Sequence, residues 1–484
     1  MSLLILNART IELPEDDRPL LAFLREGQRL TAAKPACNGG DCGACLVLLG
    51  EVVPELAPGA SEARYCAVNS CLLGTDRVAG TQLITAEGLS SGPLTPVQRA
   101  LAEEGGIQCG YCTPGLVVAL TAALLNGDPL LSAVSGNLCR CGAYAGVRRA
   151  CARIARDFAQ RPRSLREAAA LGLLLPEVAA AGEQLAAFAA QATVGTGLAE
   201  KLQQLDALNR QGQGRLVVAG ESDWSLQHAH QAKRELVAPH ALQLHRVTEL
   251  RRIRADADGL HIGAAVSVAE LLSSPLIAAD WPELPSFLEF FASPAIRNVA
   301  TIGGNLVNAS PIADLAVILL ALDAELSIVS LAGCRRIPLS GFYLAYHRTG
   351  LAADEVLSEV HVPPAGGRRL RYRKVARREH DDIASVNLAL AVGHASSGYF
   401  GEVSLAVGGV GPYPLRLPRA AAALCGRPLC AATLREALSL IDEEIAPIDD
   451  LRGSAAYKRR LLKHLLLDQV AALHPDFAWE ECLS

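Results

Sequence analysis

Eight of the fourteen cysteines fall into two sets of four, and both sets lie in the first third of the 484-residue chain. The first set is spaced C-x4-C-x2-C with one distant member, and its residues are Cys37, Cys42, Cys45 and Cys71. The second set joins a C-x2-C motif to a C-x-C motif, and its residues are Cys109, Cys112, Cys139 and Cys141. Four thiolates can hold a [2Fe–2S] cluster, and the first spacing is typical of plant-type cluster sites. Two such clusters predict that single electrons enter this protein and leave it again.

Glycines and helix starts surround both cysteine sets. Gly39, Gly40 and Gly43 lie between the first three cysteines, and glycines let a loop curl around a cluster and aim backbone N–H groups at its sulfurs. Such hydrogen bonds help to set the reduction potential. Cys112 precedes Thr-Pro-Gly and the apolar run LVVALTAALL, which predicts a helix start whose dipole favours the thiolate. The C-x-C motif likewise precedes a basic, helix-like stretch.

Other uses of cysteine compete with this interpretation. The second set can also form a structural zinc site, whereas zinc sites favour paired knuckles over the spacing of the first set. Disulfides are disfavoured, because the chain starts with the strand-like SLLILNARTIEL and not with a signal peptide. Cys66 is an alternative to Cys71 as the fourth ligand of the first set, and Cys71 is preferred. The other cysteines are interpreted as ordinary thiols: Cys66, Cys151, Cys334, Cys425, Cys430 and Cys482.

Composition limits the class of protein. Half of the residues are hydrophobic, a fifth are charged and the net charge is −5, which argues against nucleic acid or an anionic membrane as a partner. The longest apolar runs, such as LVVALTAALL and LAVILLAL, are too short to span a bilayer and predict buried helices. We therefore expect a cytoplasmic protein with room for three or four domains.

The hydrophobic pattern of the first third predicts two small modules. Residues 1–12 alternate like a strand, RPLLAFLRE predicts a short helix, and LVLLG and QLITAEGL predict further strands, which together suit a β-grasp ferredoxin module. From about residue 92 three helical patterns predict a small bundle that holds the second cysteine set. A connector rich in alanine and partly helical follows at 161–190.

The rest of the chain has an α+β pattern. RLVVAGESDW predicts a buried strand that runs into a turn, and LHIGAAVSVAELL predicts a strand and then a helix. Residues 291–322 predict a loop-rich stretch, and 368–475 predict alternating strands followed by helices.

A second candidate site lies in the segment TIGGNLVNASPIAD, residues 301–314. Its small and polar residues are Gly303, Gly304, Asn305, Asn308, Ser310 and Asp314. Such a loop can surround a pyrophosphate with backbone amides and short polar side chains, and Ala219–Ser222 offers a second loop of this kind. Neither segment has the G-x-G-x-x-G pattern or a Walker A motif. The residues alone therefore predict an unspecified dinucleotide.

The motifs CNGGDCGAC, QCGYCTPG, GNLCRC, IGGNLVNASPIADL, REHDDIASVN and PIDDLRGSAAYKRR, in this order, resemble the small subunits of bacterial xanthine dehydrogenases. These are iron–sulfur and FAD subunits of the molybdenum hydroxylase family. The resemblance implies an α+β multidomain fold, including an FAD-binding domain of the vanillyl-alcohol-oxidase (PCMH) type. The implied parts are a β-grasp [2Fe–2S] ferredoxin domain at 1–85, a helical [2Fe–2S] bundle at 86–160, a linker at 161–190, the FAD-binding domain at 191–365 and a C-terminal α+β domain, like that of carbon monoxide dehydrogenase flavoproteins, at 366–484.

The resemblance also implies roles for individual residues. Gln108 should lie near the pterin of a molybdenum cofactor on a partner chain. Phe291 should stack on the adenine of FAD, and Asp314 and Lys374 should make polar contacts towards the flavin. The residues expected around the pyrophosphate are Ala219, Gly220, Glu221, Ser222, Gly303, Gly304, Asn305, Asn308 and Ser310. The residues expected where NAD⁺ docks are Tyr346, Asp381 and Asp382.

Three positions depart from the family pattern. The usual V-A-G-G-T-D loop has Glu221 in place of its second glycine, and a Cβ and a negative charge there should weaken FAD binding unless the side chain turns outward. The usual C-T-G-Y-R-P appears as CGAYAG at 141–146, so pterin-side contacts should differ. His380 is an extra residue within the R-E-D-D-I pattern.

The resemblance implies an oxidoreductase subunit. A molybdopterin-binding large subunit would oxidise hypoxanthine and xanthine to urate, with no catalytic residue for purine oxidation on this chain. Electrons would pass through the two clusters to FAD and then to NAD⁺, in a heterotetramer of two small and two large subunits. The alternatives are the same role with an aldehyde or N-heterocycle as substrate, a partner-free NADH-dependent reductase, and a binding module built on zinc.

Overall fold

The chain folds as two compact units. The computed structural model describes residues 2–15, 18–52, 63–90, 92–192, 197–211, 217–228, 242–378, 380–393 and 398–475. The first unit comprises Met1–Gly197, Gln213–Arg246 and Ala292–Ala300, and the second comprises Leu198–Gly212, Val247–Phe291 and Thr301–Ser484.

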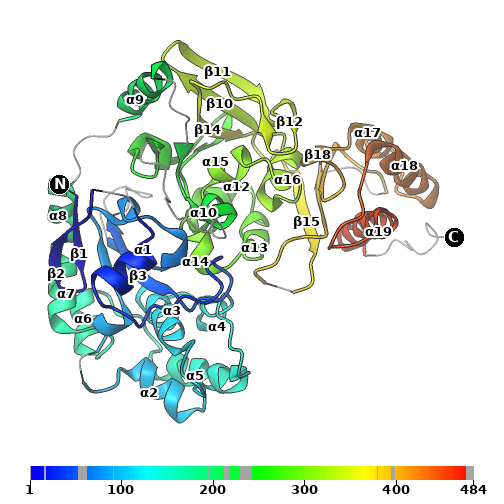
Figure 1. Ribbon diagram of the computed structural model, residues 1–484. Helices are drawn as coiled ribbons and strands as arrows, with labels where there is room; N and C mark the ends of the chain where they lie inside the picture. The colour runs from blue at the N-terminus through cyan, green and yellow to red at the C-terminus, as the bar shows by residue number, and fades with distance from the viewer. Residues whose placement is uncertain are drawn as a thin grey trace. The chain divides into compact units, whose positions relative to one another are not determined.

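The first unit begins with a five-stranded sheet in the order β2-β1-β5-β3-β4 (Figure 1). The strands are β1 (Leu3–Leu6), β2 (Arg9–Glu12), β3 (Leu46–Val52), β4 (Ala63–Asn69) and β5 (Gln82–Ile84). Only β1 and β5 pair in parallel among the described strands of this sheet. The strand predicted over residues 1–12 is a hairpin of two strands over Leu3–Glu12, because Asn7, with φ 56°, turns the chain in the left-handed region.

A short helical segment covers one face of this sheet. It consists of α1 (Leu20–Ala22) and a wider turn over Phe23–Gly27. Leu20 and Leu24 are fully buried in one core with Val47 of β3. The predicted helix RPLLAFLRE is therefore present, and its apolar face packs on the strands that lead to the cysteines.

A bundle of helices follows the sheet. Its helices are α2 (Pro96–Glu103), α3 (Thr113–Asn126), α4 (Leu130–Ala133) and α5 (Tyr144–Asp157). Thr95 and Gln98 form a capping box at the start of α2, and Gly127, with φ 76°, ends α3. Almost all side chains of α3 are buried, which explains its uniformly apolar sequence. Among the described residues no helix has both the length and the apolar character needed to cross a membrane.

The predicted connector at 161–190 is mostly helical. It forms α6 (Leu165–Ala170), α7 (Pro176–Glu183) and the greater part of α8 (Leu185–Ala192). Gln82 of β5 donates a hydrogen bond to the carbonyl of Val178 at 2.9 Å, and Val178 shares a core with α3. This stretch therefore packs as part of the first unit.

Three further segments complete the first unit. β6 (Val217–Val218) pairs in parallel with β7 (Leu242–Gln243), while α10 (Ser222–His228) and α14 (Pro294–Arg297) are short helices. The strand predicted in RLVVAGESDW is thus short, with Val217 38% exposed, and a helix rather than a turn follows it.

The second unit contains two main sheets. The first has the order β11-β10-β14-β9-β8, and its strands are β8 (Ile253–Asp256), β9 (Gly259–Gly263), β10 (Glu325–Ser330), β11 (Gly333–Pro338) and β14 (Val356–Val362). The hairpin β12 (Tyr343–Ala345) and β13 (Arg348–Thr349) lies outside it. The helices of this part are α9 (Leu198–Arg210), α11 (Val268–Ser273), α12 (Pro275–Asp280), α13 (Leu284–Leu288), α15 (Ile302–Val307) and α16 (Asp314–Ala321).

The second sheet is the C-terminal one, in the order β15-β16-β17-β18. Its strands are β15 (Arg369–Val375), β16 (Val386–Val392), β17 (Val403–Gly408) and β18 (Leu415–Arg416). The helices α17 (Pro418–Leu424), α18 (Ala431–Glu444) and α19 (Ala455–Leu473) share one core with it (Figure 1). The strands and helices predicted over 368–475 are confirmed.

The stretch 291–322 was predicted to be rich in loops apart from the buried helix at LAVILLAL, which α16 confirms, but it is largely helical throughout. It contains α14, α15 and α16, and α15 includes both Gly303 and Gly304. A Cβ on Gly303 would lie 2.7 Å from the carbonyl oxygen of Ala264. The glycine therefore allows α15 to pack closely on the chain after β9, which a sequence pattern does not reveal.

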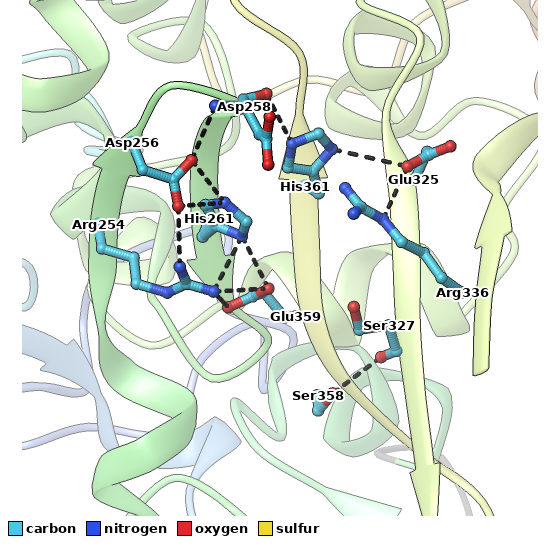
Figure 2. Close-up of polar contacts among 10 residues, drawn as sticks. All are labelled: Arg254, Asp256, Asp258, His261, Glu325, Ser327, Arg336, Ser358, Glu359 and His361. Atoms are coloured by element: carbon cyan, nitrogen blue, oxygen red, sulfur yellow. Dashed lines mark hydrogen bonds and ion pairs between the residues drawn. The ribbon is translucent and has the colours of Figure 1, made fainter. Parts of the chain in front are cut away.

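A charged network covers one side of the sheet formed by β8, β9, β14 and β10 (Figure 2). His261 and His361 are paired across β9 and β14, and their ring centroids are 4.9 Å apart. His261 bonds Glu359 at 3.0 Å through Nδ1 and Asp256 at 3.2 Å through Nε2. Arg254 bridges both carboxylates. The network fastens β8 to β14 across β9.

We expect a His261→Leu substitution to destabilise the second unit by about 1–3 kcal/mol, because it removes the hydrogen bonds of a buried side chain to the carboxylates of Asp256 and Glu359 and leaves Arg254 as their shared partner. Chemical denaturation measures the change in the free energy of unfolding. His464→Leu, at an exposed position on α19, is the matched control and should change it by less than about 0.5 kcal/mol. Equal effects of the two substitutions would show that the network does not stabilise the sheet.

Candidate iron–sulfur and flavin sites

The first cysteine set is positioned by the β3–β4 ladder. Cys45 directly precedes β3, and Cys71 lies in the 3₁₀ turn that follows β4. The register pairs Leu46 with Asn69, so the two cysteines emerge side by side at one end of the ladder. The buried Asn69 side chain also donates to the carbonyl of Gly40 at 3.2 Å, which holds the loop that carries the other two cysteines.

The four thiols of this set form two pairs. Cys37 lies within hydrogen-bond reach of Cys42, and Cys45 lies within reach of Cys71. The hydrogen bond from Cys42 lowers the pKa of Cys37 to about 5, and the same bond raises that of Cys42. The bond between Cys45 and Cys71 lowers the pKa of the first and raises the pKa of the second.

Backbone N–H groups point at these sulfurs, as the glycines of the loop predict. Gly39 N–H donates to the sulfur of Cys37 at 3.4 Å, and Gly40 N–H bonds the sulfur of Cys71. Cys66 instead stands opposite Leu49 within the β3–β4 ladder. The geometry therefore favours Cys71 over Cys66 as the partner of Cys45.

The second cysteine set lies at the starts of two helices. Cys109 and Cys112 precede α3, and Cys139 and Cys141 precede α5. Cys109 lies within hydrogen-bond reach of Cys141, and Cys112 lies within reach of Cys139. The exposed member of each motif forms one pair, and the more buried member forms the other.

Burial opposes the effect predicted for the start of α3 at Cys112. It raises the pKa of Cys112 to about 11, whereas the dipole of α3 is predicted to favour the thiolate. A backbone N–H of Tyr111 lowers the pKa of Cys109. Gln108, expected near a pterin, is exposed beside Cys109.

The paired arrangement suits a binuclear cluster better than a single metal ion. A [2Fe–2S] cluster has two irons that share four cysteines, so its ligands come as two pairs. A structural zinc ion needs four ligands around one point. The thiols of both sets therefore fit two [2Fe–2S] clusters.

The loops that carry the two sets are bonded to each other. Leu138 N–H donates to the carbonyl of Cys42 at 3.0 Å, and the Asn137 side chain donates to the carbonyl of Gly43 at 3.4 Å. Tyr111, next to Cys112, donates to the carbonyl of Pro35 at 2.6 Å. The two candidate clusters would thus be held by directly contacting loops within one unit.

Gly43 is the closest point between these loops, and we expect Gly43→Ala to disrupt both sets. Gly43 has φ 64°, and a Cβ there would lie 2.8 Å from the carbonyl oxygen of Gly136 and closer still to Asn137. The left-handed backbone and the overpacking should together cost about 2–4 kcal/mol. Iron analysis should show that more than half of the iron is lost.

Gly172→Ala is the control for this substitution. Gly172 also has a positive φ, 73°, but a Cβ there would lie 3.7 Å from its nearest neighbour, the Cδ atom of Pro96. Only the backbone cost of about 1 kcal/mol is then expected, with full iron content. If both variants kept their iron, the contact at Gly43 would not matter for metal binding.

In the first unit, the candidate pyrophosphate loop Ala219–Ser222 runs from β6 into α10. Gly220 passes so close to Val299 that a Cβ would collide with its carbonyl oxygen. Glu221 has φ 58°, and its side chain is buried inside the first unit, where the carboxylate accepts a hydrogen bond from Gly74 N–H. The carboxylate therefore turns away from the loop that is expected to surround the pyrophosphate.

In the second unit, the other candidate pyrophosphate residues cluster around α15. Thr301 caps this helix by accepting a hydrogen bond from Gly304 N–H at 3.1 Å. The Oδ1 atom of Asn305 is buried and has no hydrogen-bond partner in the described part of the chain. A hydrogen-bond donor on a bound cofactor would supply the partner that this buried acceptor lacks. Ser310 is half-buried just before α16.

Asp314 and Lys374 meet in a buried ion pair. Lys374 Nζ, from β15, lies 2.8 Å from Asp314 Oδ2 at the start of α16, and also donates to the carbonyls of Phe290 and Asp382. Asn387 of β16 donates to the other carboxylate oxygen at 2.8 Å. The second unit thus brings together the two residues expected near the flavin.

Residues expected on the NAD⁺ side occupy two places. Asp381, with φ 51°, and Asp382 follow β15, and Asp382 reaches Lys374 through its carbonyl. Tyr346 is 61% exposed and packs edge-on against His347, which bonds the carbonyl of Asn308 at 2.6 Å. No described hydrogen bond or ring contact joins Tyr346 to Asp382.

Phe290 and His380 extend this group of residues. The ring of His380, the extra residue in its motif, stacks on Phe290 with centroids 5.5 Å apart, while Phe291 follows next in the chain.

Two residues of these sites, His347 and Asn387, are not among the candidate site residues that the sequence predicts. Asn387 is a polar residue inside the fully buried strand β16. A polar residue in such a strand needs a partner, and that signal was available. Cys482 lies outside the described residues.

Four family descriptions match the chain in succession. They are a 2Fe-2S iron-sulfur cluster binding domain over 5–73, a [2Fe-2S] binding domain over 85–152, an FAD binding domain in molybdopterin dehydrogenase over 193–365, and a CO dehydrogenase flavoprotein C-terminal domain over 371–472. The predicted α+β multidomain fold is confirmed by these matches.

Individual proteins are similar over most of the chain. Xanthine dehydrogenase of Drosophila subobscura is 29% identical, with 95% of this chain and 38% of that protein covered. Aldehyde oxidase 2 of Rattus norvegicus is 29% identical, with 92% and 36% covered. The chain therefore spans less than two fifths of the length of these relatives.

A solved structure is similar to a smaller part. A chain of carbon monoxide dehydrogenase from Hydrogenophaga pseudoflava matches with a TM-score of 0.52 and 29% identity, covering 60% of this chain and 96% of that one. By these matches the chain combines two [2Fe–2S] domains, an FAD-binding domain and a CO dehydrogenase flavoprotein C-terminal domain, and it is similar to the molybdenum hydroxylases xanthine dehydrogenase, aldehyde oxidase and carbon monoxide dehydrogenase.

Proposed function

We propose that this chain is the electron-transfer subunit of a xanthine dehydrogenase. Electrons from a molybdopterin site on a partner subunit would reach FAD through two [2Fe–2S] clusters and then pass to NAD⁺. The observation that carries the proposal is the pair of thiol sets on directly bonded loops, with Leu138 N–H donating to the carbonyl of Cys42. Groups held this close within one unit suit successive single-electron steps.

The protein's residues would hold the cofactors and tune them. The first cluster would be bound by Cys37, Cys42, Cys45 and Cys71, and the second by Cys109, Cys112, Cys139 and Cys141. Bound FAD supplies a group that can take up electrons one at a time and give up two together. Asn305 is the best-supported contact for it, because its buried Oδ1 atom has no partner among the described residues. Lys374, whose three N–H donors are bonded within the protein, would instead hold Asp314 in place.

The partner and the acceptor are parts of the same proposal. A chain of carbon monoxide dehydrogenase is matched over 96% of its own length, which supports the proposal that a separate large subunit carries the molybdenum site, in a heterotetramer of two small and two large subunits. Gln108 and Cys109 are both exposed, which would suit the approach of a pterin. Tyr346, Asp381 and Asp382 would lie on the NAD⁺ side.

A second candidate is the same electron path with another substrate. Aldehyde oxidase 2 is as similar, at 29% identity, as xanthine dehydrogenase, and substrate selection would belong to the partner. A partner-free NADH-dependent reductase is a third candidate, and it requires turnover by the isolated chain.

The deciding experiment uses the complex purified from its natural source. Xanthine, an aldehyde and an N-heterocycle are compared as electron donors, with NAD⁺ and O₂ as acceptors. The proposal expects xanthine-dependent reduction of NAD⁺ and a copurifying large subunit. Oxidation of the aldehyde or the heterocycle in place of xanthine would favour the second candidate, and full NADH-dependent turnover without a partner would favour the third.

A further inference from the structure

Glu221 occupies a backbone position that suits glycine. Its φ of 58° lies in the left-handed region, where an L-residue with a Cβ has a cost that glycine avoids. The motif that this loop resembles has glycine there. A glutamate at such a position is expected only where its side chain gains something that offsets the strain.

The side chain of Glu221 makes two hydrogen bonds inside the first unit. One carboxylate oxygen accepts from Gly74 N–H at 3.1 Å, and the other accepts from the Gln243 side chain at 2.6 Å. The residue is only 7% exposed. Gly74 stands three residues after Cys71, so the bond joins the candidate pyrophosphate loop to the segment that leaves the first cysteine set.

Neighbouring residues hold the same segment. Ser225, one helical turn after Glu221 on α10, donates to the carbonyl of Leu72 at 2.8 Å. Arg246, just after β7, donates to the carbonyl of Asp76 at 3.1 Å and to that of Ala79. Residues 72–79 are therefore hydrogen-bonded by three parts of the same unit: the loop Ala219–Ser222, α10 and the segment after β7.

Burial makes these bonds hard to replace. A glycine at position 221 would relieve the backbone strain but would leave Gly74 N–H and the Gln243 amide without the acceptors described above. A glutamine would keep one acceptor oxygen and nearly the same shape. The two substitutions therefore separate the effect of the Cβ from the effect of the hydrogen bonds.

We propose that Glu221 is a positioning residue that fastens the FAD-binding loop to the segment after Cys71, so that FAD affinity and the surroundings of the first cluster depend on the same side chain. The proposal rests on the proposed function, because it requires FAD at Ala219–Ser222 and a cluster at Cys71. From the sequence, Glu221 is expected to weaken FAD binding unless its side chain turns outward; the side chain is instead buried in the first unit, and the proposal gives it a supporting role.

The test compares the wild-type complex with Glu221→Gly, Glu221→Gln and Ser225→Ala variants. The flavin-free proteins are titrated with FAD, and EPR spectra are recorded after reduction. Glu221→Gly should raise the dissociation constant of FAD at least tenfold and change the spectrum of the centre that depends on Cys71, with the other centre unaltered. Glu221→Gln should restore most of the affinity. If Glu221→Gly fails to fold, Ser225→Ala provides the test in its place. This variant keeps the loop sequence and should change the same spectrum.

The matched control is Glu87→Gln. Glu87 also accepts a backbone N–H with its carboxylate, that of Ala32 at 2.8 Å, but it lies outside residues 72–79. This variant should match the wild type in FAD affinity and in both spectra.

Several outcomes would overturn the inference. If Glu221→Gly bound FAD as tightly as the wild type, or more tightly, the side chain of Glu221 would have no role in FAD binding. Weaker FAD binding with both EPR spectra unchanged would show that Glu221 shapes the loop without coupling it to the first cluster. A wild-type protein without iron or FAD would refute the proposed function, and the fastening role with it.

Discussion

A Cys71→Ala variant should lose one of two iron–sulfur centres, whereas a Cys66→Ala variant should keep both. The geometry places Cys71 beside Cys45 and leaves Cys66 in the β3–β4 ladder. A [2Fe–2S] cluster needs four ligands, so iron should fall from about four atoms per chain to about two in the first variant only. Iron analysis and low-temperature EPR of the reduced proteins measure the loss.

Cys66→Ala is an internal control for this prediction. Both cysteines lie near the end of β4, so general damage to this strand would affect the two variants alike. Loss of a centre in Cys66→Ala with retention in Cys71→Ala would reverse the ligand assignment. Zinc in place of iron in the wild-type protein would refute the cluster assignment altogether.

The cysteine sets could be predicted from the sequence because most of their members are close along the chain. A C-x4-C-x2-C loop or a C-x2-C motif brings thiols together whatever the rest of the fold does. The fourth, distant ligand of the first set is harder to predict from the sequence, since Cys66 and Cys71 lie in one short segment. Only the register of β3 on β4 distinguishes them, and register depends on long-range pairing.

The flavin region could be predicted less well. The segment around Gly303 and Gly304 was expected to be a loop, because glycine has a low helix propensity. Its helix forms because Gly303 allows close packing on Ala264, a contact across 39 positions of sequence. The direction of the Glu221 side chain depends on Gly74, 147 residues earlier in the chain. No local pattern carries that information.

The bonded cysteine loops bear on the order of the electron path. Both thiol sets belong to the first unit, and hydrogen bonds from Asn137, Leu138 and Tyr111 connect their loops directly. Cys109 and Cys141 are exposed, whereas Cys45 and Cys71 are buried. An external donor would therefore meet the second set first. We therefore propose that electrons would pass from the partner to the helical part first and then to the ferredoxin part.

Replacing Lys374 by methionine should cost both stability and flavin. The Lys374 side chain is 7% exposed and its partner Asp314 is 13% exposed, so the change leaves a buried carboxylate without its cation and with the neutral Asn387 and Tyr372 as partners. Removing one member of a buried ion pair costs about 3–5 kcal/mol. We therefore expect a clear fall in the free energy of unfolding, and FAD content well below the wild-type level at equal iron content.

A second buried lysine separates these two effects. Lys458 of α19 is 2% exposed and bonds Asp450 at 2.6 Å, but that carboxylate is 38% exposed. Lys458→Met should cost about 1–3 kcal/mol, since water can take over part of the partner's hydrogen bonding. It should leave the FAD content unchanged, because no candidate flavin residue contacts Lys458 among the described hydrogen bonds. If both variants lost flavin in proportion to their stability, Lys374 would act only through the fold, and its pairing with Asp314 would have no direct part in holding the cofactor.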